Sequence, residues 1–312
     1  MGDGNNAFFH AYLKAKHSQK TMNLLQKEDG SILHSQQDIL QEVREFYASL
    51  MGMKDKTLIH VDIDAMRRGK QLSMQQRNFL VGKVTENEIE KALQGIGDLK
   101  SPGADGYGAK FFKSCWKFIK TDVVAAVMEF FDLNRIFIPF NKTVVTLIPK
   151  NDHAKGIKDY RPIASCTTFY KIISRIISAR LGAVFQEVLN HSQAAFIPGQ
   201  NIHNHIMLAY EIIKGYTRQT GAPRCMLQID LQKAYDMVDW GALEDILREL
   251  GIPPKFIQWI MLTVTTVSYE FNVNGVLTKP MQACRGVRQG DPLSPLLFVA
   301  IMEYLSRLLI KM

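Results

Sequence analysis

Asp230 lies at the end of an apolar run in the stretch CMLQIDLQKAYDMVDW, residues 225–240. The run predicts a buried strand, and a strand that ends in a carboxylate is a common way to hold a divalent cation rigidly. A phosphoacceptor aspartate or a buried salt-bridge partner would give the same local pattern. Asp230 is therefore a candidate metal ligand, and both alternatives stay open at this point.

The residues that follow Asp230 predict a turn suited to a nucleotide. Asp236 comes six residues later, with Lys233 and Tyr235 between. We therefore expect the chain to turn and to present backbone N–H groups where a triphosphate would sit. The ring of Tyr235 would close the floor of a sugar pocket.

A second stretch with the right chemistry is RGVRQGDPLSP, residues 285–295. Gly286 and Gly290 allow the backbone to approach a base pair closely, and the Gln289 amide offers paired donor and acceptor groups. Asp291, Pro292 and Ser294 then lead into a helix.

Positive charge is concentrated in one segment of the chain. The net charge is +8, and residues 100–180 alone hold 14 Lys and Arg against 6 Asp and Glu. Such a concentration is typical of a surface that binds phosphates, although a solvated helix face is the simpler interpretation of charge alone. The motifs have to decide between these two interpretations.

Length and composition bound the class of protein. The chain has 312 residues, of which 46% are hydrophobic, and this is enough for a sizeable core. We find neither a membrane-spanning stretch nor a secretory signal, so we expect an intracellular protein that is not secreted, with the nucleus and the cytoplasm both open. The four cysteines lie far apart and predict reduced, packed thiols.

The elements that must position these residues can be placed by periodicity and end signals. Hairpins are expected at Asp29-Gly30 and Asn274-Gly275, and strands at 143–150 and 225–230. Residues 53–76 are expected to form a connector, in which Asp62 and Asp64 alternate as in a surface strand. An Arg161-Pro162 pair is expected to open a helix. Helices are predicted at about 35–52, 85–96, 109–133, 201–217, 240–250 and 254–266, and from 294 to the end.

The motifs together resemble those of the reverse transcriptases of LINE-type (non-LTR) retrotransposons, particularly those of plants. The resemblance rests on five segments in the family's order and spacing, and it covers nearly the whole chain. They are KSPGADGYGAKFFK, TLIPKNDHAKGIKDYRPIAS, QAAFIPGQNIHNHIMLAYEI, QIDLQKAYDMVDW and GVRQGDPLSPLLFVAIMEYLSRLL.

The resemblance implies an α+β fold of the right-hand polymerase type, with fingers, an incomplete palm and a small helical and hairpin N-terminal region. Residues 1–84 would be the extension and connector that follow the endonuclease in the family. Residues 85–221 would form the fingers, and residues 222–312 part of the palm.

The resemblance also implies roles for single residues. Asp230 would be the catalytic aspartate that binds two Mg²⁺ ions, and the Leu231 carbonyl would be a further metal ligand. Tyr235 would be the steric gate against a ribose 2′-hydroxyl. Nucleotide-binding roles would also fall to four residues, Lys150 and Arg161 in the fingers and Gln289 and Gly290 under the templating pair. The simpler interpretations are a solvated strand end for Lys150 and a helix-entry salt bridge for Arg161.

One departure from the family pattern matters. The family's second metal motif is an aromatic-Ala-Asp-Asp hairpin, and no adjacent Asp-Asp pair occurs in the 312 residues. We therefore expect a truncated reverse transcriptase that is inactive alone, whose family partners are an RNA template, a DNA primer and dNTPs, with no membrane. Self-association through an exposed, unfinished palm is also expected. The alternatives are a non-catalytic nucleic-acid-binding remnant that uses the basic fingers and an unrelated α/β enzyme with an Asp-bearing strand.

Overall fold

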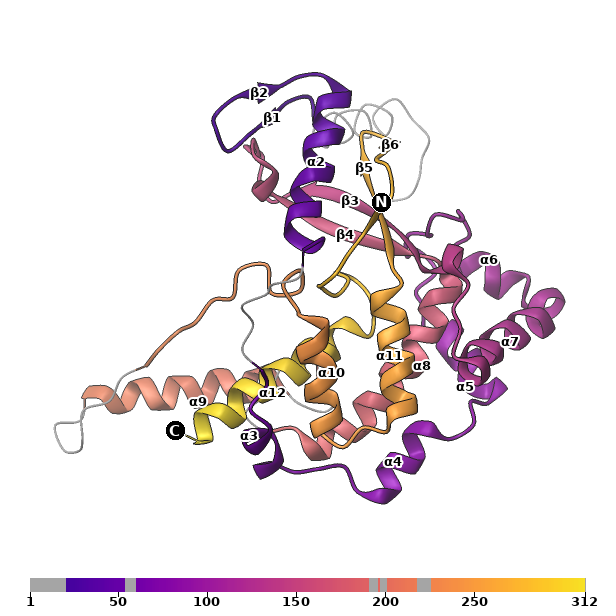
Figure 1. The fold of residues 1–312 in the computed structure, drawn as a ribbon, viewed down its shortest axis with the longest axis vertical. Helices are drawn as coiled ribbons and strands as arrows, with labels where there is room; N and C mark the ends of the chain where they lie inside the picture. The colour runs from indigo at the N-terminus through magenta and orange to yellow at the C-terminus, as the bar shows by residue number, and fades with distance from the viewer. Residues whose placement is uncertain (1–20, 54–59, 191–195, 197–200, 218–225, 312) are drawn as a thin grey trace.

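The computed structural model describes residues 21–53, 60–190, 196, 201–217 and 226–311, and helices and strands alternate irregularly along them (Figure 1). The α-helices are α2 (Gln36–Met51), α3 (Ile63–Arg68), α4 (Met74–Val81), α5 (Glu86–Gln94), α6 (Ala109–Ser114), α7 (Trp116–Leu133), α8 (Thr168–Val188), α9 (Ile202–Lys214), α10 (Trp240–Glu249), α11 (Pro254–Thr265) and α12 (Ser294–Lys311). The strands are β1 (Leu25–Gln26), β2 (Ile32–Leu33), β3 (Lys142–Pro149), β4 (Tyr160–Cys166), β5 (Ser268–Val273), β6 (Val276–Leu277) and β7 (Met281–Gln282). Short 3₁₀ turns are η1 (Ile138–Asn141), η2 (Ile157–Asp159) and η3 (Gly215–Thr217).

The main sheet has the strand order β4-β3-β5-β6, with β7 also paired to β5. β3 and β4 form an antiparallel hairpin in which Ile148 lies opposite Arg161. β3 runs parallel to β5, so strands far apart in sequence are joined in one sheet. The hairpins expected at Asp29-Gly30 and Asn274-Gly275 are confirmed, and both glycines have positive φ, near +87°.

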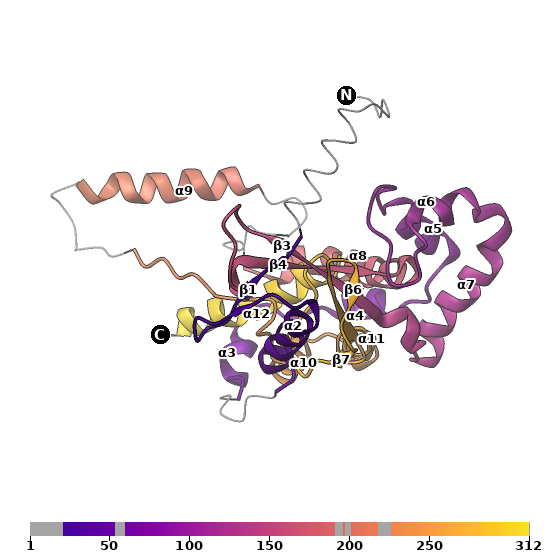
Figure 2. The ribbon, with the colours of Figure 1, turned by 90° about the horizontal axis from the view of Figure 1, so that it is seen from above.

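Helix α2 covers one face of this sheet (Figures 1 and 2). Ile39, Val43 and Tyr47 recur at helical spacing and are buried against side chains of β3 and β5. The ring of Tyr47 stacks on that of Phe271, with 4.3 Å between centroids. The first described residues therefore share a core with the sheet that carries Lys150 and Arg161.

The larger core is helical and is built around α8, with α4, α5, α7, α10, α11 and α12 contributing buried residues. Most of α8 is buried, and apolar residues such as Ile172, Ile176 and Val184 recur along it at helical spacing. In Figure 2, α9 stands apart from this body. Its exposed apolar residues include Ile206, Met207, Leu208 and Tyr210, each more than half exposed.

The predicted strand at 225–230 is wrong for the residues that the structure describes. Residues 226–230 have no strand assignment and are exposed, and no described strand pairs with them. An apolar run becomes a strand only where a neighbouring strand satisfies its backbone hydrogen bonds, and none of the described strands does so here.

Three smaller expectations also need correction. Arg161-Pro162 lies inside β4, and the sheet tolerates the proline because β4 is an edge strand. Asp62 begins helix α3, its side chain accepting a hydrogen bond from the Ala65 N–H, so this segment is not a strand. The helix expected at 109–133 is broken at Cys115 into α6 and α7.

The other helix predictions are confirmed within a few residues. Ser35 precedes α2 as expected but makes no capping hydrogen bond, whereas Thr85 and Glu88 form the predicted capping box of α5. Cys115, Cys166 and Cys284 are free thiols, and Cys225 lies outside the described residues. Among the described helices, none combines the length and the hydropathy that crossing a membrane requires.

Candidate nucleotide site

A cavity of about 230 Å³ lies between α2, the β3–β4 hairpin and the turn that follows Asp230. It brings together three of the residues singled out in the sequence, Lys150, Arg161 and Gln289, from two distant segments of the chain. The remaining lining residues are Phe46, Tyr47, Leu50, Ile157, Lys158, Tyr160, Pro162, Lys233 and Asp236.

The β3–β4 hairpin positions the two predicted cations. Lys150 follows the last residue of β3, and its backbone N–H donates to the Asp159 carbonyl at 2.8 Å. Its Nζ donates to the Lys158 carbonyl at 2.6 Å. Arg161 projects from the edge strand, and both side chains are exposed. The helix-entry salt bridge that was the alternative for Arg161 is excluded by its position in a strand.

The turn expected after Asp230 is present and spans residues 232–237. Lys233 adopts a left-handed conformation, with φ near +50°, and its carbonyl accepts the Asp236 N–H at 2.9 Å. Its Nζ lies 4.3 Å from the centroid of the Phe46 ring, a cation–π contact. Burial lowers the pKa of Lys233, as does the nearby charge of Lys158. Lys233 thus joins Lys150, Lys158 and Arg161 as a fourth cation of the cavity wall.

Asp236 provides the carboxylate of the cavity in place of Asp230. Its side chain is buried, and burial raises its pKa, against the opposing effect of the Gln289 hydrogen bond. Nε2 of Gln289 donates to Oδ1 and Oδ2 of Asp236 at 3.3 and 3.5 Å. A buried carboxylate in a cavity lined with cations is the kind of group from which functional sites are built.

The loop that carries Gln289 is tied to this turn by its backbone. The N–H of Gly286 donates to the Val238 carbonyl at 2.7 Å, and that of Val287 to the Tyr235 carbonyl at 2.8 Å. Gly290 has a positive φ of 105°, which favours glycine there. The Gln289 carbonyl accepts the Ala164 N–H at 3.0 Å, which fixes the loop to β4.

Arg288 anchors the same loop from the interior, a role that the sequence did not reveal. Its guanidinium is buried, lies 4.1 Å from the Tyr170 ring centroid and donates to the Thr263 carbonyl at 3.0 Å. The hydroxyl of Tyr170 in turn donates to Asp291 at 2.7 Å. Arg288 thus faces the core, whereas the neighbouring Gln289 lines the cavity.

The structure does not bring the other predicted site residues into the cavity. Asp230 and Leu231 are exposed and are not among its lining residues. Tyr235 is half-buried, and its ring stacks on that of Phe298 in α12 at 5.3 Å between centroids. Tyr235 thus packs against the helical core, one residue before Asp236, and does not line the cavity.

The described residues do not form a site that fits two Mg²⁺ ions. In the part of the chain that the structure describes, no group of three or more His, Cys, Asp or Glu side chains is placed to hold a metal ion. Two cations that act together in catalysis need several oxygen ligands, which the single carboxylate of Asp230 does not supply.

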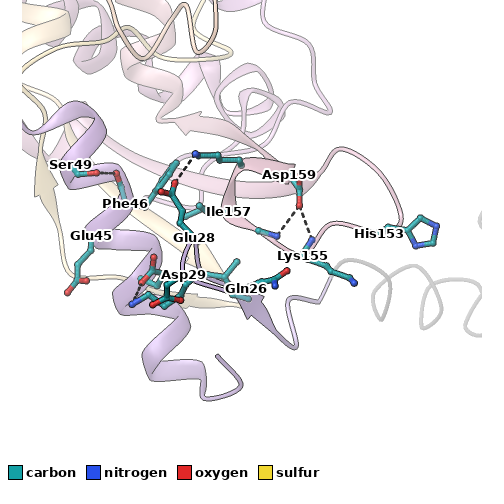
Figure 3. A pocket seen from close by; sticks show the side chains of 15 residues that line it. Gln26, Glu28, Asp29, Glu45, Phe46, Ser49, His153, Lys155, Ile157 and Asp159 are labelled. Carbon is teal, nitrogen blue, oxygen red and sulfur yellow. Dashed lines mark hydrogen bonds and ion pairs between the residues drawn. The ribbon is translucent and has the colours of Figure 1, made fainter. Parts of the chain in front are cut away.

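A wider groove adjoins the cavity and shares Phe46, Ile157 and Lys158 with it. It lies between α2, the β1–β2 hairpin and the loop from β3 to β4 (Figure 3). Here Glu28 forms an ion pair with Lys158 at 2.8 Å, and the Gln26 N–H donates to the Lys155 carbonyl at 2.8 Å. These contacts attach the N-terminal hairpin to the loop that carries Lys150.

The basic segment 100–180 is only partly available as a surface. Arg180 is buried and pairs with Glu88, and Lys113, Lys120, Lys142 and Lys158 form ion pairs with acidic residues. The segment thus contributes fewer exposed, uncompensated charges than its composition suggests. The exposed cations that form no ion pair with a described acidic residue are Lys100, Lys110, Lys117, Arg135, Lys150, Lys155 and Arg161.

A comparison with known protein families identifies the family of this chain. Residues 148–312 match the family model of the reverse transcriptase (RNA-dependent DNA polymerase), and this match includes Lys150, Arg161, Asp230 and Gln289. The chain belongs to the reverse transcriptase family.

Similar proteins come from non-LTR retrotransposons. The transposon TX1 uncharacterized 149 kDa protein of Xenopus laevis is 30% identical over 96% of this chain and 23% of its own length. The Pol polyprotein from the type-2 retrotransposable element R2DM of Drosophila melanogaster is 25% identical over 72% of this chain and 21% of its own length. The chain thus spans about a quarter of the length of these relatives.

Proposed function

We propose that the chain forms the nucleotide-binding part of a reverse transcriptase that copies RNA into DNA for a non-LTR retrotransposon. In this proposal the β3–β4 hairpin and the neighbouring helices act as fingers, and the sheet with the Gln289 loop acts as part of the palm of a right-hand polymerase. An RNA template, a DNA primer and dNTPs are the partners.

One observation carries this proposal. The cavity combines Lys150, Arg161 and Lys233, which suit a polyphosphate, with the uncharged amide of Gln289. Several cations together with a neutral hydrogen-bonding group match a molecule that has a charged triphosphate and a neutral sugar and base. Family membership supports the same assignment.

Binding of an RNA–DNA duplex, with and without dNTP, tests the proposal. We expect dNTP to strengthen duplex binding by the wild-type chain and to have a smaller effect on the Lys150→Gln and Arg161→Gln variants. Lys279→Gln removes an exposed cation outside the cavity and serves as the control. Duplex binding that is indifferent to dNTP in the wild-type chain would contradict the proposal.

The second candidate function is nucleic-acid binding without catalysis. It is supported by exposed cations such as Lys150, Lys155 and Arg161, which form no ion pair with a described acidic residue and suit the phosphates of any nucleic acid. Under either candidate we expect no primer extension by this chain alone with Mg²⁺ or Mn²⁺, because two ions need further ligands. Extension that is lost in Asp230→Asn would show that the chain holds the metals itself.

Tyr235 is proposed as the sugar gate because it directly precedes Asp236, which lines the cavity. Tyr235→Ala would then raise the affinity for ribonucleotides relative to deoxyribonucleotides. Unchanged relative affinity would exclude this role.

Self-association is proposed through the exposed apolar residues of 226–231 and α9. Leu227 is 78% exposed and Met207 59% exposed, and exposed apolar side chains of this kind favour association. Sedimentation of the wild-type chain and of a Leu227→Glu variant tests this, and we expect the variant to shift toward the monomer.

A further inference from the structure

The carboxylate of Asp236 has an unusual environment for a buried charge. It is 7% exposed, and the side-chain hydrogen bonds it accepts in the described structure come from one uncharged group, the Gln289 amide. A buried carboxylate that serves stability normally has a cation at ion-pair distance or several N–H donors. The stability of the fold therefore does not explain Asp236.

The Gln289 backbone is fixed, so the orientation of its side-chain amide is the remaining variable. The carbonyl of Gln289 is bound by the Ala164 N–H at 3.0 Å, and the preceding residues are hydrogen-bonded to the turn at 232–237 and to Val238. A glutamine amide has two donors on Nε2 and an acceptor at Oε1, and either end can face a neighbour. An ionised carboxylate accepts hydrogen bonds only, so Asp236 admits the Nε2 end and not the Oε1 end.

This inference rests on the proposed function. We propose that Asp236 is a positioning residue that orients the Gln289 amide, so that Oε1 is presented as an acceptor to the bound nucleotide. The ligand group that it meets is an uncharged donor, a hydroxyl of the sugar or an amino group of the base. The phosphates are left to Lys150, Arg161 and Lys233, which line the same cavity.

The Asp236→Asn variant distinguishes orientation of the Gln289 amide from a contribution of Asp236 to the stability of the fold. Asn has nearly the same shape but offers both a donor and an acceptor, so it satisfies Gln289 in either orientation. Burial raises the pKa of Asp236, which means that the ionised form costs stability at neutral pH. We therefore expect Asp236→Asn to melt at the wild-type temperature or above while it binds nucleotide less tightly.

The experiment is a double-mutant cycle on dNTP affinity, measured with the full chain bound to an RNA–DNA duplex. Gln289→Met keeps the length of the side chain and removes the amide. We expect Asp236→Asn and Gln289→Met each to weaken dNTP binding about threefold to tenfold, the effect of one hydrogen bond. The double variant should bind no more weakly than Gln289→Met alone. Asp38→Asn, which changes an exposed acid on α2, should bind as the wild type does.

Three results would overturn the inference. The first is a double variant whose loss of dNTP affinity is the product of the two single losses. The second is wild-type dNTP affinity in Asp236→Asn, and the third is a lowered melting temperature of Asp236→Asn that accounts for its loss of binding. If Gln289→Met weakens binding and Asp236→Asn does not, this inference fails and the proposed function stands. If the wild-type chain on its duplex does not bind dNTP, the proposed function fails and the inference with it.

Discussion

Gly286 is the residue at which the Gln289 loop comes closest to the turn after Asp230. Its φ is +92°, and a Cβ placed on it would lie 2.9 Å from the Asp236 carbonyl oxygen. An alanine there would meet both a disfavoured conformation and a backbone atom that has no freedom to move away.

We predict that Gly286→Ala destabilises the fold more than Gly275→Ala does. Gly275 has nearly the same φ, +87°, but open space around its Cβ position, so it reports the conformational cost alone. The overlap at Gly286 should add at least about 1 kcal/mol to the loss of unfolding free energy. Urea denaturation of both variants measures the difference, and equal losses would show that the loop moves away from Asp236 freely.

The cavity residues were only partly predictable from the sequence. Lys150, Arg161 and Gln289 stood in recognisable motifs, and the turn after Asp230 was expected from the residues that follow it. Phe46 was missed because nothing local connects α2 with a turn nearly two hundred residues later. Arg288 is buried against α8 and α11 and Gln289 lines the cavity, and these different positions depend on contacts between segments far apart in the sequence.

At the scale of elements, the clearest failures of sequence reasoning concern strands. A helix satisfies its own backbone, so α5 and α10 were predictable from periodicity and end signals. A strand depends on a partner elsewhere in the chain. The same apolar character that makes β3 a central strand leaves residues 226–230 exposed and unpaired among the described strands.

Arg180 connects α8 to the segment between α4 and α5. It is buried, pairs with Glu88 at 2.8 Å and donates to the carbonyls of Leu80, Gly82 and Lys83. Removing its guanidinium leaves a carboxylate and three carbonyl groups without their donor.

We predict that Arg180→Met lowers the unfolding free energy by about 3 kcal/mol, because a buried guanidinium that binds three backbone carbonyls is lost together with its ion pair to the partly exposed Glu88. Arg248→Met is the matched control, because Arg248 pairs with Glu244 and Asp245 on the exposed face of α10. The control should lose less than about 1 kcal/mol. Equal effects in chemical denaturation would contradict a buried clamp at Arg180.

Helix α2 packs against the sheet that carries the cavity, so a substitution that weakens this packing should also weaken nucleotide binding. Tyr47 is 3% exposed, stacks on Phe271 and lines the cavity. We predict that Tyr47→Ala costs about 3–5 kcal/mol of unfolding free energy and weakens dNTP binding. Phe118→Ala, which removes a ring that is 82% exposed, should change neither quantity appreciably. Unaltered dNTP affinity in a folded Tyr47→Ala variant would show that α2 is not a wall of the site.

At the scale of the whole molecule, the net charge is +8, and the excess of Lys and Arg lies in residues 100–180. In the folded protein, fewer of these side chains are exposed and unpaired than the sequence suggests. Several Lys and Arg side chains of residues 100–180 form ion pairs with acidic residues, as Arg180 and Lys142 do, and Arg180 is also buried. The charge available for phosphates is therefore concentrated on fewer side chains, among which Lys150 and Arg161 line the cavity itself.

Binding of nucleic acid should reflect this small set of contacts. Each cation that neutralises a phosphate releases bound counterions from the nucleic acid, so the logarithm of the binding constant falls linearly with the logarithm of the salt concentration. We predict that Lys150→Gln and Arg161→Gln each reduce the slope for RNA–DNA duplex binding by about one unit.

Lys142→Gln is the control for this prediction. It removes a cation of the same segment that is already paired with Glu270 at 2.8 Å, so its slope should match the wild type. Titrations between low and physiological salt measure all four slopes. A slope that falls equally in all three variants would mean that the paired lysine contacts phosphate as well. A wild-type interaction without salt dependence would exclude phosphate recognition by this surface.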